Sequence, residues 1–158
     1  MSHEQLVEFV TDLYTNCRAA RPYLDFYCDP QPLKLFQKYL DNILKELQRG
    51  KSWNSTARIS KVKSLLREFA SYGVSVEMVI DITLMTAEAI IQLQLVRVLK
   101  EPILKGCAFF INDALAKADK AGIFTYASSK VDKLLNGTIG SSRYISYLRE
   151  VIAHPENL

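Results

Sequence analysis

A line of polar side chains on one long apolar segment could support acid–base or metal chemistry. Its members are Glu77, Asp81, Glu88 and Gln92. At about 100° of rotation per residue, a helix places these four side chains within about 60° of one another. Paired carboxylates can exchange protons with a substrate or hold a metal ion when they face a cavity. The alternative is a strip of solvent exposure, or an ion pair with a neighbouring cation such as Arg58.

Histidines and cysteines do not complete a catalytic or metal site. Di-metal carboxylate bundles need Glu-x-x-His pairs, and neither His3 nor His154 falls in one. The 3 cysteines lack C-x-x-C spacing. The chain also has no Walker loop, dinucleotide fingerprint, nucleophile elbow or H-E-x-x-H motif. The sequence therefore predicts no metal and no cofactor, and it favours a protein that is not an enzyme.

Positive charge is concentrated in the stretch from residue 45 to residue 67. This stretch holds seven basic residues and one acid, which leaves 13 basic and 16 acidic residues in the rest of the chain. Basic side chains beside an exposed aromatic ring can grip phosphates and stack a base. The candidate residues for such contacts with an anion or a nucleic acid are Arg49, Lys51, Trp53, Lys61, Lys63 and Arg67.

Helical phase argues against one continuous basic stripe. With Arg58 at 0°, Lys61 lies at about 300°, Lys63 at about 140° and Arg67 at about 180°, while the apolar stripe is centred at about 40°. We expect the stem of Arg58 to pack inward and its guanidinium to reach a carboxylate. Lys63 and Arg67 are expected to point to solvent.

The elements that must position these residues are helices, because apolar residues recur at three-four spacing along most of the chain. A capping box of Ser2 and Gln5 starts the first helix, which is predicted over about 3 to 20 and ends at Arg21-Pro22. Residues 23–30 are predicted to be a connector. Further helices are expected from Pro30 to near Gly50, from a cap at Asn54 or Ser55 to Gly73, from Ser75 to Leu99, from Pro102 to Gly122, over about 126 to 136, and across Tyr144 to Ile152.

About seven helices with short connectors predict a single all-α domain over residues 1–158. The architecture is expected to be a helical bundle or an irregular antiparallel helix array. A short α-solenoid of helix pairs is the alternative, although the pairs share no residue pattern of the kind such repeats need. Residues 76–99 are apolar around most of the helix circumference, so this helix is expected in the middle of the fold.

Residues 76–99 do not resemble a membrane span. Polar side chains, among them Asp81, Glu88 and Arg97, interrupt every window of about 20 residues. The opening MSHEQLVEFV lacks the basic region followed by an apolar region that a secretory signal needs. Cysteines without close pairing fit a reducing compartment. We therefore expect a cytoplasmic protein with no membrane partner.

Two stretches carry a recognisable pattern: YLDF at 23–26 followed by Pro30, and ARISKVKSLLREFASYG at 57–73. Together with the apolar helix that bears Glu88, they resemble an uncharacterised all-helical family of bacterial domains of unknown function. The resemblance covers roughly residues 5–150. It implies an all-helical fold and a bacterial, cytoplasmic origin, and it brings no catalytic activity with it. The glycine-rich turn of that family holds an aromatic residue that GTIGSSR at 137–143 lacks.

By position, this resemblance draws attention to Asp25, Arg58 and Glu88. Each lies among apolar neighbours, where an unpaired charge would cost several kcal/mol. We therefore predict that these three residues, together with Asp81, form one buried or half-buried polar cluster.

No motif assigns an activity, so the sequence supports only a class of function. The leading hypothesis is a non-enzymatic helical interaction or scaffold domain that associates with a second copy or another protein through an apolar helix face. Its basis is the apolar fraction of 49% together with the lack of a catalytic constellation. One alternative is a nucleic-acid-associated protein that uses residues 45–67. The other is an enzyme with a carboxylate-lined site around Glu88.

Overall fold

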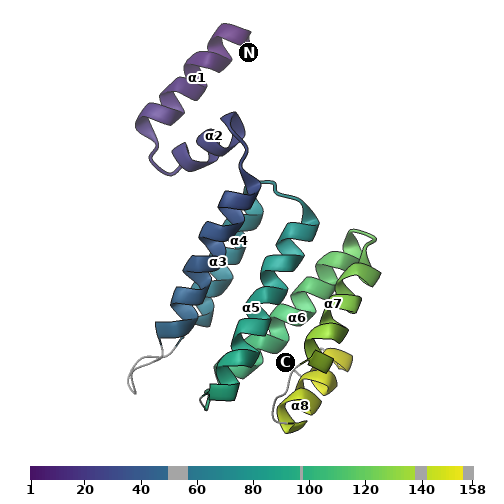
Figure 1. Ribbon diagram of the computed structural model, residues 1–158. Coiled ribbons are helices and arrows are strands. Elements are labelled where there is room, and N and C mark those ends of the chain that lie inside the picture. The colour runs from purple at the N-terminus through teal and green to yellow at the C-terminus, as the bar shows by residue number, and fades with distance from the viewer. Residues whose placement is uncertain (50–56, 97, 138–141, 155–158) are drawn as a thin grey trace. The chain divides into compact units, whose positions relative to one another are not determined.

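The protein is all-helical, as the sequence predicts. The computed structural model describes residues 1–49, 57–96, 98–137 and 142–154, and these residues contain eight α-helices and no strand (Figure 1). The helices are α1 (His3–Asn16), α2 (Arg21–Cys28), α3 (Pro32–Gln48), α4 (Ile59–Ser71), α5 (Val76–Val96), α6 (Glu101–Lys120), α7 (Phe124–Gly137) and α8 (Ser142–Ala153).

Two predicted helix starts are confirmed by their capping hydrogen bonds. At α1 the Gln5 N–H donates to Ser2 Oγ at 3.2 Å, and the Ser2 N–H donates to Gln5 Oε1 at 2.9 Å. At α5 the Met78 N–H donates to Ser75 Oγ at 3.3 Å. Each bond satisfies an N–H group that has no acceptor within its helix. The cap predicted at Asn54 or Ser55 lies outside the described residues, and α4 follows Arg58 as its N-cap.

The segment predicted as a connector between the first two helices is itself helical. It forms α2, and α1 ends at Asn16, earlier than predicted. Pro22 stands in the first turn of α2, where a missing N–H costs no hydrogen bond, so this proline begins α2 and does not end α1. Arg21 links the start of α2 to the end of α1. Its Nε donates to the Tyr14 carbonyl at 2.6 Å, and a terminal guanidinium nitrogen donates to the Thr15 carbonyl at 2.8 Å.

The chain divides into two compact units, residues 1–35 and 36–158. The single domain predicted over residues 1–158 stays a prediction. The first unit contains α1, α2 and the start of α3. None of the residues of α1 and α2 is buried. The amphipathic pattern expected for the first helix is present, but its apolar stripe is exposed. The exposed large side chains of α1 are Leu6, Val7, Phe9, Val10 and Tyr14.

The core of the second unit lies between α5 and α6, the two helices that share the most extensive contact, with α4, α7 and α8 around them (Figure 1). From α5 the core takes Ile80, Ile82, Ile90 and Ile91. From α6 it takes mainly small side chains beside Phe110 and Ile111, and these let the helix backbones approach closely. The small residues are Gly106, Cys107, Ala108, Ala114 and Ala118.

The central helix, α5, buries two hydroxyl groups without leaving them unsatisfied. Thr83 Oγ1 donates to the Val79 carbonyl at 2.7 Å, and Thr86 Oγ1 donates to the Ile82 carbonyl at 2.7 Å. A buried hydroxyl without a partner would be costly, so these internal bonds allow α5 to be enclosed on most sides. Among the described helices, none combines the length and the apolar character that crossing a membrane would need.

Candidate functional site

The predicted polar cluster divides into separate contacts, and Arg58 belongs to the first. Its guanidinium meets Glu46 of α3, with Nε donating to Oε2 at 3.4 Å and a terminal nitrogen lying 3.2 Å from Oε1. Glu46 is only 9% exposed, and Arg49 approaches the same carboxylate at 3.6 Å. Arg58 reaches a carboxylate as expected, but that carboxylate is Glu46, because the end of α3 lies beside the start of α4.

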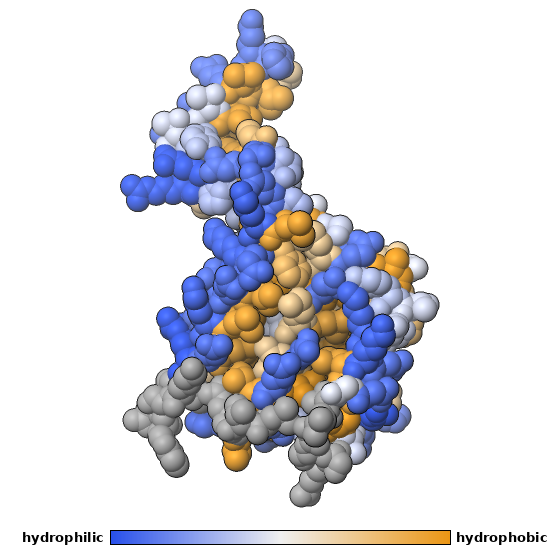
Figure 2. Space-filling view, in the orientation of Figure 1, coloured by the Kyte–Doolittle hydropathy of each residue, from blue (hydrophilic) through white to orange (hydrophobic). Residues whose placement is uncertain are grey.

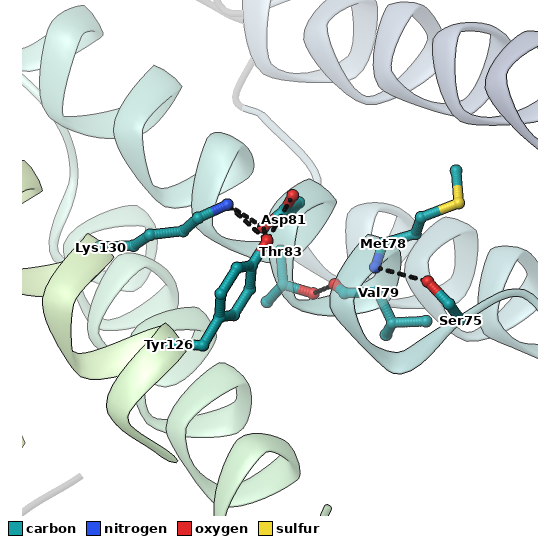
Figure 3. Close-up of polar contacts among 7 residues, drawn as sticks. All are labelled: Ser75, Met78, Val79, Asp81, Thr83, Tyr126 and Lys130. Carbon is teal, nitrogen blue, oxygen red and sulfur yellow. Dashed lines mark hydrogen bonds and ion pairs between the residues drawn. The ribbon is translucent and has the colours of Figure 1, made fainter. Parts of the chain in front are cut away.

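Asp81 makes the second contact, with two residues of α7. Tyr126 donates from its hydroxyl to the two carboxylate oxygens at 2.9 and 3.0 Å. Lys130 donates to Asp81 Oδ1 at 2.5 Å and to the Tyr126 oxygen at 2.7 Å. Figure 3 shows both α7 side chains converging on the α5 carboxylate. The acceptor positions of Asp81 are therefore occupied by neighbours, which favours a structural ion pair over a free general base.

The charge state of Lys130 follows from these bonds. Burial lowers the pKa of Lys130, but the hydrogen bonds to Asp81 and Tyr126 outweigh burial and hold this pKa above its ordinary value. The ammonium group is therefore charged at neutral pH. A nucleophilic lysine needs the opposite shift, a depressed pKa.

An open cavity of about 340 Å³ lies between α3, α5 and α7, and we name it the α3–α5–α7 groove. It is lined by Phe36, Asp81, Leu84, Met85, Glu88, Lys130, Lys133 and Leu134. Figure 2 shows apolar side chains gathered between rows of hydrophilic ones over α3 and α5. Two acids and two lysines balance in the lining. Asp81 and Glu88 thus share this groove, and the Glu88 carboxylate accepts from Gln92 Nε2 at 3.4 Å.

The remaining members of the predicted polar clusters lie elsewhere. Asp25 is an exposed residue of α2 in the first unit. Glu77 lies in the first turn of α5 and is not among the residues that line the groove. Arg58 has Glu46 as its ionic partner. Within the predicted set, Asp81 and Glu88 therefore share the groove, two turns apart on one face of α5.

A second cavity, of about 170 Å³, lies between α4, α5 and α6, and we name it the basic pocket. Its polar lining consists of Lys63, Arg67, Lys117 and Asp113, which gives two excess positive charges. Its apolar lining is Leu66, Ala70, Val79, Phe109 and Phe110, with Thr83 beside them. Two of the predicted anion-binding residues, Lys63 and Arg67, are therefore brought together.

The three cations of the basic pocket differ in the contacts that their charged groups make. Lys63 Nζ lies 3.4 Å from the centroid of the Phe109 ring, a cation–π contact. Lys117 pairs with Asp113 one turn away. Arg67 is exposed and has no ionic partner among the residues that the structure describes. Within this part of the chain, the pocket thus offers one guanidinium that is open to an incoming anion beside apolar side chains.

Of the other predicted anion-binding residues, the two that the structure describes do not line the basic pocket. Lys61 is exposed on α4 and does not line the pocket. Arg49 approaches Glu46. Lys51 and Trp53 lie outside the described residues. Among the predicted basic residues that the structure describes, Lys63 and Arg67 line the basic pocket, and Phe109 and Lys117 line it from α6.

Sequence reasoning missed Glu46, Tyr126, Lys130, Phe109 and Lys117. One signal was present, because Tyr126 and Lys130 are four residues apart and so share a helix face, as do Asp113 and Lys117. Nothing in the local sequence tells which other helix such a pair meets.

Cysteine and metal chemistry have little support in the described part of the chain. No group of three or more His, Cys, Asp or Glu side chains there could hold a metal ion. Cys107 is buried, its thiol donates to the Ala87 carbonyl at 3.5 Å, and burial raises the pKa of this thiol to about 12. A thiol with so high a pKa is a poor nucleophile at neutral pH.

Comparison with known proteins finds no match for this chain among protein-family models, curated proteins or solved structures. The resemblance to a bacterial family of unknown function therefore stays a prediction, and the function has to be proposed from the geometry.

Proposed function

We propose that this protein is a non-enzymatic helical interaction domain that self-associates through the apolar face of α1. The observation that carries this proposal is the exposure of that face. Leu6, Phe9 and Val10 lie within about 100° of one another on the helix, and Phe9 is 54% exposed. Contiguous exposed apolar surface on a folded protein is typical of an interaction site.

The length of α1 supports the same proposal. An isolated helix of 14 residues is only marginally stable in water, because its few hydrogen bonds barely offset the cost of nucleation. Amphipathic helices in proteins owe most of their stability to packing of the apolar face. A partner that covers Leu6, Phe9 and Val10 would supply this packing.

The polar contacts of the second unit support a non-enzymatic role. Asp81 is engaged by Tyr126 and Lys130, and Glu46 by Arg58 and Arg49. Catalytic carboxylates need an open acceptor position toward the substrate. Glu88 lines the α3–α5–α7 groove and keeps an open acceptor position. The described contact of its carboxylate is with Gln92, which is neither an acid nor a base.

Sedimentation or light scattering over a range of concentrations tests the proposal. We expect the wild-type protein to pass from monomer to dimer as its concentration rises. The triple variant Leu6→Gln, Phe9→Gln, Val10→Gln should move the midpoint at least about tenfold higher, because burying each apolar side chain is worth about 1.5–3 kcal/mol. The matched control is Thr11→Gln with Thr15→Gln, on the polar face of the same helix. A wild-type protein that stays monomeric throughout would overturn the proposal.

A further inference from the structure

Helix α1 is acidic. From residue 2 to residue 17 the chain has three acids, Glu4, Glu8 and Asp12, and no lysine or arginine. Asp12 lies three residues after Phe9, about 60° away around the helix. A surface that receives the Phe9 side chain would therefore also receive the Asp12 carboxylate at its edge.

The basic pocket combines an apolar cavity with cationic side chains. Its apolar lining includes Phe109, which is 37% exposed, and the buried ring of Phe110. A cavity of about 150 Å³ is large enough to take benzene, so this cavity of about 170 Å³ has room for one aromatic side chain. An incoming ring could pair edge-on with Phe109, the geometry that aromatic pairs prefer. Arg67 also lines the cavity, is exposed, and has no ionic partner in the described part of the chain.

Size, hydrophobicity and charge therefore match between these two surfaces of the same chain. We infer that α1 of a second copy docks on the basic pocket, with Phe9 filling the cavity and Asp12 pairing with Arg67. This inference rests on the proposed self-association and names the surface that receives α1.

A reciprocal dimer is the arrangement that uses these surfaces fully. When each copy gives its α1 to the other, a two-fold axis makes the same contact twice. One face of a helix about 21 Å long covers a limited area, and doubling the contact brings the total toward the roughly 1,600 Å² of a stable interface. The α3–α5–α7 groove fits an acidic helix less well, because its two acids and two lysines already balance.

A charge exchange between copies tests the inference. The two variants are Asp12→Arg and Arg67→Asp, made in separate full-length chains. Each variant alone places like charges together at both contacts, so its monomer–dimer midpoint should rise at least about tenfold. In an equimolar mixture, the arginine introduced in the first variant meets the aspartate introduced in the second at one contact, and the other contact is native. The mixture should therefore dimerise as the wild-type protein does.

The matched control is Lys61→Asp, which makes the same change of charge on α4 outside the basic pocket and should leave the midpoint unchanged. Circular dichroism checks that each variant is folded. If Asp12→Arg and Arg67→Asp dimerise normally while the triple α1 variant does not, the inference is overturned and the proposed function stands. That result would indicate α1 pairing with another surface, such as a second α1.

Three other results also overturn the inference. The first is a mixture that fails to recover dimerisation. The second is recovery only when both changes are in one chain. The third is an Arg67→Asp variant that self-associates normally but loses binding to a single-stranded oligonucleotide, which would assign the basic pocket to nucleic acid instead. A monomeric wild-type protein would overturn the inference together with the proposed function.

Discussion

Lys130 is partly exposed and donates two hydrogen bonds, so the charge of this one residue affects the stability of the second unit. Its ammonium group joins Asp81 of α5 to Tyr126 of α7, so one cation helps to fix two helices. The raised pKa of Lys130 means that folding favours the charged form. The contribution of this pair to stability therefore depends on pH.

We predict that Lys130→Met lowers the free energy of unfolding by about 0.5 kcal/mol at neutral pH, the range for a partly exposed ion pair. The folded-state pKa lies above the unfolded value of about 10.4, so the contribution is fully present below about pH 10.4 and is lost as the pH rises through the folded-state pKa. Urea unfolding of both proteins between about pH 7 and the strongly alkaline range measures this difference. Lys133→Met, on the same helix, is the control, and a difference that stayed constant with pH would contradict the prediction.

Residue-level contacts were only partly predictable from the sequence. Helical phase correctly indicates that Arg58 reaches a carboxylate, but the identity of Glu46 depends on how α3 meets α4. The same phase places Lys63 and Arg67 about 40° apart, so these two residues can share a pocket even though the basic residues as a set do not share a face. Phe109 and Lys117 complete that pocket from α6, and their sequence distance hides the contact.

The start of α5 provides a test at the scale of an element. Ser75 caps the central helix, so we predict that Ser75→Ala lowers the free energy of global unfolding by about 1 kcal/mol, because the Met78 N–H loses its acceptor. Ser75→Asp should retain most of the stability, since an aspartate also caps and suits the helix dipole. Denaturant unfolding of the three proteins checks the order. Equal losses for Ala and Asp would contradict a capping role.

At this scale, the sequence predicts best which segments form helices. It predicts least well which helix faces are buried. Three-four periodicity predicts α1, α3, α4, α5, α6, α7 and α8, whereas it misses the short α2, because Pro22 signals the end of a helix as well as the start of one. For α1 the pattern shows which face is apolar but not what covers it. That depends on contacts beyond the segment itself, and in the single chain the face is exposed.

The difference between the two units gives a prediction for the whole molecule. At high dilution the amide hydrogens of α1 should exchange rapidly, because no residue of α1 is buried, whereas those of α6 should be protected by the core. Raising the protein concentration should slow exchange in α1 and leave α6 unchanged, since the core already protects α6 in the single chain. Hydrogen exchange followed by mass spectrometry at several concentrations measures both helices at once. Protection of α1 equal to that of α6 at the lowest concentration would contradict the prediction.

The three thiols also separate the two units. Cys17 and Cys28 are exposed and belong to the first unit, whereas Cys107 is enclosed in the core of the second. A thiol-reactive dye or spin label added to the native protein therefore attaches beside α1 and α2 and leaves the second unit unmodified. The natural sequence thus carries its own attachment points for a spectroscopic reporter on the first unit, without an engineered cysteine.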